Sequence, residues 1–202
     1  DVERLAALLD PTETLLISDE VYEHMVFDCA PHVSASSIPA LAARAFVVSS
    51  FGKTFHVTGW KIGTVAAPAA LAAEFRKVHQ FNVFTVSTPM QHALAAYLAD
   101  AAPYRTLPAF YQAKRDLFRT GLAGTRLRLL PSEGSYFQCV DYSAVSDLGE
   151  EAFCRWLTSD VGVAAIPLSA FYADGRDQQI ARLCFAKRDE TLHLALDRLA
   201  KI

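Results

Sequence analysis

The sequence has few cysteines, and their arrangement suggests neither a disulfide framework nor a zinc site. Its four cysteines are widely spaced along 202 residues and form no C-x-x-C pair. Such spacing in a chain of this length favours reduced thiols in a cytoplasmic protein. The six histidines likewise lack the spacing of metal ligands. We therefore expect no metal.

Long apolar runs and a strong charge of either sign are also absent. No apolar stretch reaches the length needed to cross a bilayer, and no signal peptide opens the chain. The formal net charge is only −3. Because so small a charge creates no strong field, it argues against a nucleic acid or an acidic membrane surface as a partner.

The composition is that of a folded globular protein, with 52% hydrophobic and 20% charged residues. The length suits one large domain or two small ones. The chain starts at Asp1 and enters an amphipathic pattern at once, with Val2, Leu5, Leu8 and Leu9. We expect this to be the middle of a helix–strand unit, with a further part of the protein upstream.

The first part of the chain alternates short apolar strands with helices. We predict strands over 15–17, 45–49 and 62–66, and helices over 2–9, 38–43, 69–80 and 88–100. Continuous apolar strands between helices indicate an α/β unit with a buried, mostly parallel sheet. Three strands make an incomplete sheet, so we expect apolar surface at an edge.

The pattern changes after a long helix that begins near Pro103 or Pro108. Short strands are predicted over 127–130, 136–140, 163–166 and 180–185, with helices over 149–158 and 189–201. This is the pattern of a small α+β layer. We therefore divide the chain into residues 1–104 and residues 105–202.

The segment from Ser49 to Gly63 is the richest in chemistry. Lys53 directly follows an apolar strand and lies among aromatic residues. An apolar setting lowers the pKa of a lysine and makes its amine a nucleophile. A phosphate-binding P-loop is excluded, because it needs a glycine where Val47 stands. The alternative is that Lys53 and Lys61 are ordinary surface lysines.

Two other segments carry candidate polar groups. Asp19 and Tyr22 follow the first strand, at the place where open α/β sheets bind ligands. Alternatively, Asp19 caps a turn and Tyr22 packs. Arg182 lies in an apolar strand, and a buried arginine usually has a planar acidic partner. Alternatively, Arg182 faces water from an edge strand.

Together these segments resemble the class I and II aminotransferases, which are fold-type I enzymes that use pyridoxal 5′-phosphate (PLP). The resemblance is strongest to bacterial methionine aminotransferases and kynurenine/glutamine transaminases. It is carried, in matching order and spacing, by the segments 49–63, 134–137, 163–167 and 180–187. It implies that residues 1–104 are the C-terminal part of a PLP-binding large domain and residues 105–202 a small domain.

The resemblance implies a role for each matching residue. Lys53 matches the lysine that binds the cofactor covalently. Asp19 matches the carboxylate paired with the pyridine nitrogen, and Tyr22 matches the phenol near the ring oxygen. Ser50 and Lys61 match residues that contact the cofactor phosphate, although many relatives have arginine at the position of Lys61.

The substrate side follows in the same way. Arg182 matches the arginine that binds the α-carboxylate of the substrate, and Phe84 resembles an aromatic residue near the substrate pocket. The implied reaction exchanges an amino group between methionine or an aromatic amino acid and a 2-oxo acid, in a full-length homodimer. A PLP-dependent carbon–sulfur β-lyase would use the same lysine. As an isolated chain, these 202 residues would be an inactive fragment or an interaction module.

Overall fold

The computed structural model describes all residues, 1–202, and these divide into two compact units. The first unit is Asp1–Leu107 and the second is Pro108–Ile202. The division falls at the start of helix α7, Leu107–Leu122. The boundary expected from the sequence, between residues 104 and 105, falls within the short helix α6, Ala102–Arg105.

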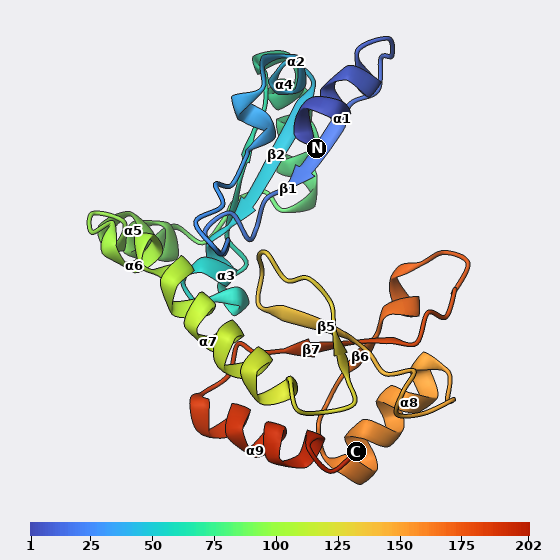
Figure 1. Ribbon diagram of the computed structural model, residues 1–202. Coiled ribbons are helices and arrows are strands. Elements are labelled where there is room, and N and C mark those ends of the chain that lie inside the picture. The colour runs from blue at the N-terminus through green and yellow to red at the C-terminus, as the bar shows by residue number, and fades with distance from the viewer. The chain divides into compact units, whose positions relative to one another are not determined.

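The first unit is a three-stranded sheet with helices connecting its strands (Figure 1). The strands are β1 (Leu16–Asp19), β2 (Ala45–Ser50) and β3 (Gly63–Ala66). The α-helices are α1 (Val2–Leu9), α2 (Pro39–Ala42), α3 (Phe51–Thr54), α4 (Ala69–Asn82), α5 (Thr88–Tyr97) and α6, with 3₁₀ turns at Ala35–Ser37 and Thr58–Trp60.

The central strand β2 pairs with β1 in parallel and with β3 in antiparallel fashion. The register places Asp19 opposite Val48 and Ser50 opposite Gly63. The antiparallel direction of β3 follows from a connection that contains no crossover helix. Only two short helical turns separate β2 from β3, whereas a parallel neighbour needs a longer crossover. The sheet is therefore mixed rather than mostly parallel within these three strands.

The first unit exposes much apolar surface of its own. Ile17 of β1 is 73% exposed, and α4 has no buried residue. Phe81 of α4 is 89% exposed. This agrees with the expectation that three strands leave the sheet incompletely covered.

The second unit is an antiparallel sheet packed against helices. The strand order is β4 (Arg128–Leu129), β5 (Phe137–Asp141), β7 (Ile180–Cys184) and β6 (Ile166–Pro167). Helices α7 and α9 (Asp189–Leu199) lie side by side along it (Figure 1). The remaining elements are α8 (Glu150–Trp156), a π-helical turn at Leu157–Val161 and a 3₁₀ turn at Leu168–Phe171.

Close packing in the second unit depends on a small residue and on stacked rings. A Cβ at Gly121 of α7 would lie 2.4 Å from Leu196 Cδ1 of α9, so the glycine allows the two helices to approach. The buried rings of Tyr142 and Phe153 stack with centroids 3.7 Å apart. The Tyr142 hydroxyl donates to the Leu148 carbonyl at 2.9 Å, which satisfies its polar end.

The predicted strand at 163–166 is largely wrong. Only Ile166 of that range is in a strand, and β6 continues to Pro167. The reason is that the preceding helical turn ends with Gly162 at φ +78°, and the Val163 amide still donates back to Leu157. The end of the helix therefore includes Val163, a β-branched residue that the sequence pattern assigned to a strand. None of the helices is both long and apolar enough to span a membrane.

We predict that Gly63→Ala destabilises the pairing of β2 with β3. The new Cβ would lie 2.5 Å from the main-chain oxygen of Ser49, which cannot move without displacing β2. The expected cost is about 1–3 kcal/mol, read as a lower Tm in thermal unfolding. Gly59→Ala is the matched control, because nothing lies within 4 Å of the Cβ position at Gly59. Equal Tm values for the two variants would contradict the close approach.

Candidate functional site

The strand register gathers several candidate residues at one end of the first sheet. Strands β1 and β2 are parallel, so they finish at the same end, and the antiparallel β3 begins there. Asp19 is the last residue of β1 and Ser50 is the last residue of β2. Lys53 follows β2 in α3, and Lys61 lies two residues before the start of β3. We call this region the Asp19–Lys53 end of the sheet.

Lys53 is held by a short, tightly built helix. The Ser50 side chain caps α3 by accepting a hydrogen bond from the Gly52 amide at 3.1 Å. The Gly52 carbonyl accepts from the Val57 amide at 3.0 Å and from the Thr58 hydroxyl at 3.1 Å. A Cβ at Gly52 would lie 2.9 Å from Thr58 Cα, so only glycine fits.

The Lys53 side chain itself is half-buried and unpaired. Its ammonium forms no hydrogen bond or ion pair with another residue of the chain. The rings of Phe51 and Phe55 stack one turn apart on its helix, with centroids 6.2 Å apart. The amine is therefore available to a ligand.

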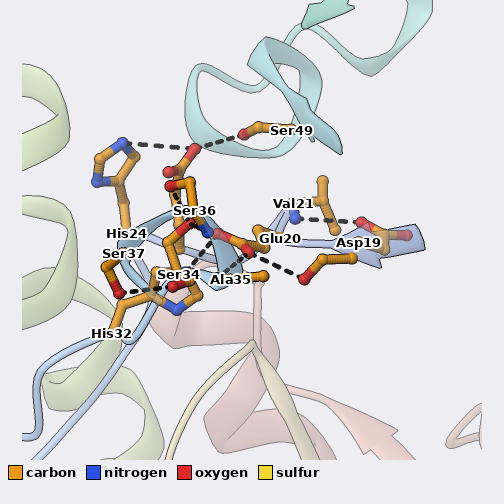
Figure 2. A network of polar contacts seen from close by, with 12 residues as sticks. Asp19, Glu20, Val21, His24, His32, Ser34, Ala35, Ser36, Ser37 and Ser49 are labelled. Atoms are coloured by element: carbon orange, nitrogen blue, oxygen red, sulfur yellow. Dashed lines mark hydrogen bonds and ion pairs between the residues drawn. The ribbon is translucent and has the colours of Figure 1, made fainter. Parts of the chain in front are cut away.

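Asp19 and Glu20 point in opposite directions at the end of β1, as successive strand residues do. Asp19 is exposed, and one of its oxygens accepts from the Val21 amide at 3.2 Å (Figure 2). The turn-capping alternative for Asp19 is therefore confirmed, and its cofactor role stays a prediction. Its second carboxylate oxygen has no partner in the chain.

Glu20 is buried, and it joins β1 to the segment that carries His32 and Ala35. One Glu20 oxygen accepts from the Ser18 hydroxyl and from the Ala35 amide, each at 2.9 Å, and the other lies 2.9 Å from His32 Nε2 (Figure 2). Burial alone would raise the pKa of this carboxyl. The hydrogen bonds from His32, Ala35 and nearby serines outweigh it and hold the pKa below its ordinary value.

The other predicted cofactor residues lie at or near the same end. Ser50 Oγ, besides capping α3, faces the Ile62 carbonyl at 3.4 Å. Lys61 is exposed, with a left-handed backbone at φ +57°, and forms no ion pair in the chain. Tyr22 is half-buried in the turn after β1.

Phe84 lies on the loop that follows α4. It is 81% exposed, and its backbone is left-handed at φ +66°. Its loop neighbours Val83 and Val86 line a cavity of about 380 Å³ together with Lys61, but Phe84 itself does not. The structure therefore places the loop near Lys61 and leaves the Phe84 ring at the surface of the first unit.

Arg182 lies in the second unit, on the interior strand β7. Its guanidinium carbon lies 4.0 Å from the ring centroid of Phe137 and 4.6 Å from that of Phe171. Its Nε atom is buried and has no hydrogen-bond partner. No carboxylate of the chain lies within ion-pair distance of Arg182. The edge-strand alternative was wrong, since β7 is an interior strand, and no acidic residue of the chain is the partner of Arg182.

The face of the sheet around Arg182 also carries two thiols. Cys139 is directly opposite Arg182, and Cys184 is opposite Phe137, so all four side chains share one face. Burial raises the pKa of the Cys139 thiol, although the nearby Arg182 charge opposes this. Arg182 thus has aromatic rings and a neutral thiol around it, and the charge of its guanidinium is uncompensated.

The family model for aminotransferase class I and II matches residues 1–199. The chain belongs to this family. It is 53% identical over 191 residues to the methionine aminotransferase of Escherichia coli, covering 94% of this chain and 50% of the relative. It is 31% identical to kynurenine–oxoglutarate transaminase 1 of Homo sapiens, covering 100% of this chain and 53% of the relative.

Solved structures of this aminotransferase family match the fold of the chain. An Escherichia coli crystal structure with a methionine aminotransferase function matches with a TM-score of 0.96 and 50% identity, over 100% of this chain and 54% of that one. The N-succinyldiaminopimelate aminotransferase of Mycobacterium tuberculosis matches with a TM-score of 0.93 and 35% identity, over 99% and 53%. The predicted fold class is thereby confirmed. The chain spans about half the length of the relatives it matches.

The cofactor of this aminotransferase family is PLP, and the residues of the first unit fit it. PLP presents an aldehyde, a pyridine nitrogen and a phosphate. The Asp19–Lys53 end offers an amine without a protein partner, an exposed carboxylate, and a hydroxyl with a free lysine. Lys53 would hold the aldehyde carbon, Asp19 the nitrogen, and Ser50 with Lys61 the phosphate.

We predict that Glu20→Gln lowers the Tm of the full-length protein most strongly near neutral pH. Because folding lowers the pKa of Glu20, its stabilisation is fully present above the ordinary value of 4.5 and is lost as pH falls through the folded value. Loss of its charged hydrogen bonds should cost about 1–3 kcal/mol.

The measurement is the Tm difference between wild type and Glu20→Gln across a pH series. The difference should narrow as the solution is acidified below pH 4.5. Glu13→Gln, at an exposed glutamate of the same unit, is the control, and its Tm should equal that of wild type at every pH. A Glu20→Gln gap that is independent of pH would contradict the role of the ionised carboxylate.

Proposed function

We propose that the full-length protein is a PLP-dependent aminotransferase that exchanges an amino group between an amino acid and a 2-oxo acid. The observation that carries this proposal is the Asp19–Lys53 end of the sheet. There an unpaired amine and an exposed carboxylate follow adjacent parallel strands. Membership of the aminotransferase family supports the reaction class.

When bound, PLP supplies an electron sink that stabilises negative charge on the α-carbon of the substrate. Asp19 would hold the ring nitrogen and favour its protonated form, which strengthens the ring as an electron sink. Its free oxygen suits this task, since the other oxygen is fixed by the Val21 amide. Tyr22, in the turn after Asp19, supplies a phenol near the ring oxygen.

Lys53 has two tasks in this proposal. Its amine holds the cofactor covalently in the resting protein. Once substrate has displaced it, the same amine would be free to take the proton from the α-carbon of the substrate and to return it, as general base and then general acid. The rigid turn around Gly52 limits where this amine can move.

Arg182 orients the substrate by binding its α-carboxylate. A guanidinium presents donors in a planar fork that matches a carboxylate. The buried Nε of Arg182, which has no partner in the chain, is a donor that such a carboxylate would satisfy. Fixing the carboxylate aligns the α-carbon–hydrogen bond for proton removal. We propose that Phe84 lies near the substrate pocket.

Methionine and aromatic amino acids are the proposed substrates, from the names of the matched relatives. A PLP-dependent carbon–sulfur β-lyase would use the same residues. The two activities separate in one assay, because transfer requires a 2-oxo acid acceptor and the lyase releases pyruvate without one. We further propose a homodimer, with residues 1–104 in the large domain and 105–202 in the small domain. The four free thiols support a cytoplasmic location.

We predict that Lys53 is the lysine that binds PLP. Borohydride reduction of the full-length protein with PLP, followed by peptide mapping, should place the label on Lys53. The Lys61→Ala variant should still be labelled, because Lys61 is proposed to contact only the phosphate. A label on Lys61 in the wild-type protein would refute the assignment.

We also predict that Arg182→Lys weakens amino-acid use while retaining positive charge. Loss of the fork geometry should lower kcat/KM by one or two orders of magnitude, about 1.4–2.8 kcal/mol. Arg155→Lys is the control, since Arg155 is exposed on α8 and pairs only with Glu151. Unchanged kcat/KM for every amino acid tested with Arg182→Lys would rule out the role.

A further inference from the structure

The segment between β6 and β7 brings an aromatic ring to Arg182. It begins with the 3₁₀ turn Leu168–Phe171, and no strand or longer helix follows before β7 begins at Ile180. The ring of Phe171 lies 4.6 Å from the Arg182 guanidinium carbon. The second ring, that of Phe137, comes from the regular strand β5, so only the Phe171 side depends on an irregular segment.

Both ends of this segment are tied to one buried carboxylate. Glu150, at the start of α8, is 1% exposed. One of its oxygens accepts from the Ser169 amide at one end of the segment. The other accepts from the Gln178 and Ile180 amides, each at 3.0 Å, at the opposite end. Burial would raise the pKa of Glu150, but these amides hold it below its ordinary value, so the carboxylate is ionised at neutral pH.

A second carboxylate closes the same junction from the other side. One oxygen of Asp177 accepts from the Glu150 amide at 2.7 Å, and the other accepts from the Gln179 amide at 2.9 Å. The segment thus accepts a hydrogen bond from the start of α8 through Asp177, and three of its amides donate hydrogen bonds to Glu150 of α8. Two main-chain stretches and one helix start are joined here without any ion pair.

The middle of the segment has little other support. Phe171 is 58% exposed and Tyr172 is 37% exposed. Arg176 pairs with Asp174 at the surface, within the segment itself. The position of Phe171 over Arg182 is therefore set mainly by the anchored ends, and the anchor is Glu150.

We propose that Glu150 is a positioning residue of the carboxylate-binding site: by holding the 169–180 segment, it keeps Phe171 packed on Arg182 with the Arg182 donors free for a substrate carboxylate. This rests on the proposed role of Arg182. Glu150 does not touch the substrate. It acts through main-chain hydrogen bonds, so a neutral amide cannot replace it, because a glutamine presents an N–H₂ group to amides that are themselves donors.

Loss of the Glu150 anchor should change KM and leave kcat nearly unchanged. If Phe171 moves, the guanidinium gains rotamer freedom and is wetter, so carboxylate binding weakens while proton transfer by Lys53 is unaffected. Glu150→Gln in the full-length enzyme should raise the KM for L-methionine roughly tenfold. The kcat at saturating substrate and the absorbance of bound PLP should stay within about twofold of wild type.

The matched control is Glu151→Gln, at the next residue of α8. Glu151 is exposed and pairs only with Arg155, so its KM should equal that of wild type. Hydrogen exchange gives a readout independent of activity. In Glu150→Gln, amides of the 168–180 peptide should exchange roughly tenfold faster, while peptides of α9 keep the wild-type rate.

The double variant Glu150→Gln/Arg182→Lys tests whether Glu150 acts through Arg182. If it does, adding Glu150→Gln to Arg182→Lys should raise KM much less than tenfold, because the two changes remove one shared interaction. Additive effects, or a fall in kcat with unchanged KM, would overturn the proposal. If Glu150→Gln does not fold, Asp177→Asn is the variant to test. We expect it to raise KM as well, but by less than tenfold. An unchanged KM would then overturn the proposal.

The roles of Arg182 and of Glu150 can be refuted separately. An Arg182→Lys variant with wild-type kcat/KM would refute the proposed role of Arg182, and the Glu150 proposal with it. A raised KM in Arg182→Lys together with a wild-type KM in Glu150→Gln would refute the Glu150 proposal alone.

Discussion

The hydrogen bonds of β2 to both of its neighbours are the constraint on which the proposed cofactor site depends. Parallel pairing with β1 brings the ends of two strands together, so Asp19 and Ser50 finish at the same end. Antiparallel pairing with β3 returns the chain to that end, which places Lys61 beside them. Gly63 makes this return possible, since its missing Cβ lets β3 approach the Ser49 carbonyl. The tight turn at Gly52 then fixes where Lys53 leaves the sheet.

The second unit holds a half-buried cation, Arg182, without a counter-charge in the chain. Two aromatic rings and a neutral thiol surround Arg182, and one of its donors has no partner. An unsatisfied buried donor costs free energy, which supports the proposal that a substrate carboxylate pairs with Arg182. Stability is supplied elsewhere in the unit, by the Glu150 junction and the stacked rings of Tyr142 and Phe153. Carboxylates thus perform structural work in both units, Glu20 in the first and Glu150 in the second.

Much of this could be predicted from the sequence, because motif residues and strand patterns are local. Lys53 and Asp19 were found as polar groups directly after apolar strands. The direction of β3 was missed because hydrophobic alternation says nothing of which way a strand runs, although the lack of a predicted helix between the second and third strands was a signal for it. The surroundings of Arg182 were missed because Phe171 comes from an irregular segment. Glu150 gave no signal, since its partners are main-chain amides, which every residue except proline has.

The central claim is that Lys53 and Asp19 serve one cofactor. A crystal structure of the full-length protein grown with PLP tests it most directly. We expect continuous electron density from Lys53 Nζ to the cofactor, with an Asp19 oxygen within hydrogen-bond distance of the pyridine nitrogen and the phosphate beside Ser50 and Lys61. A cofactor joined to a different lysine, or a pyridine nitrogen facing away from Asp19, would contradict it.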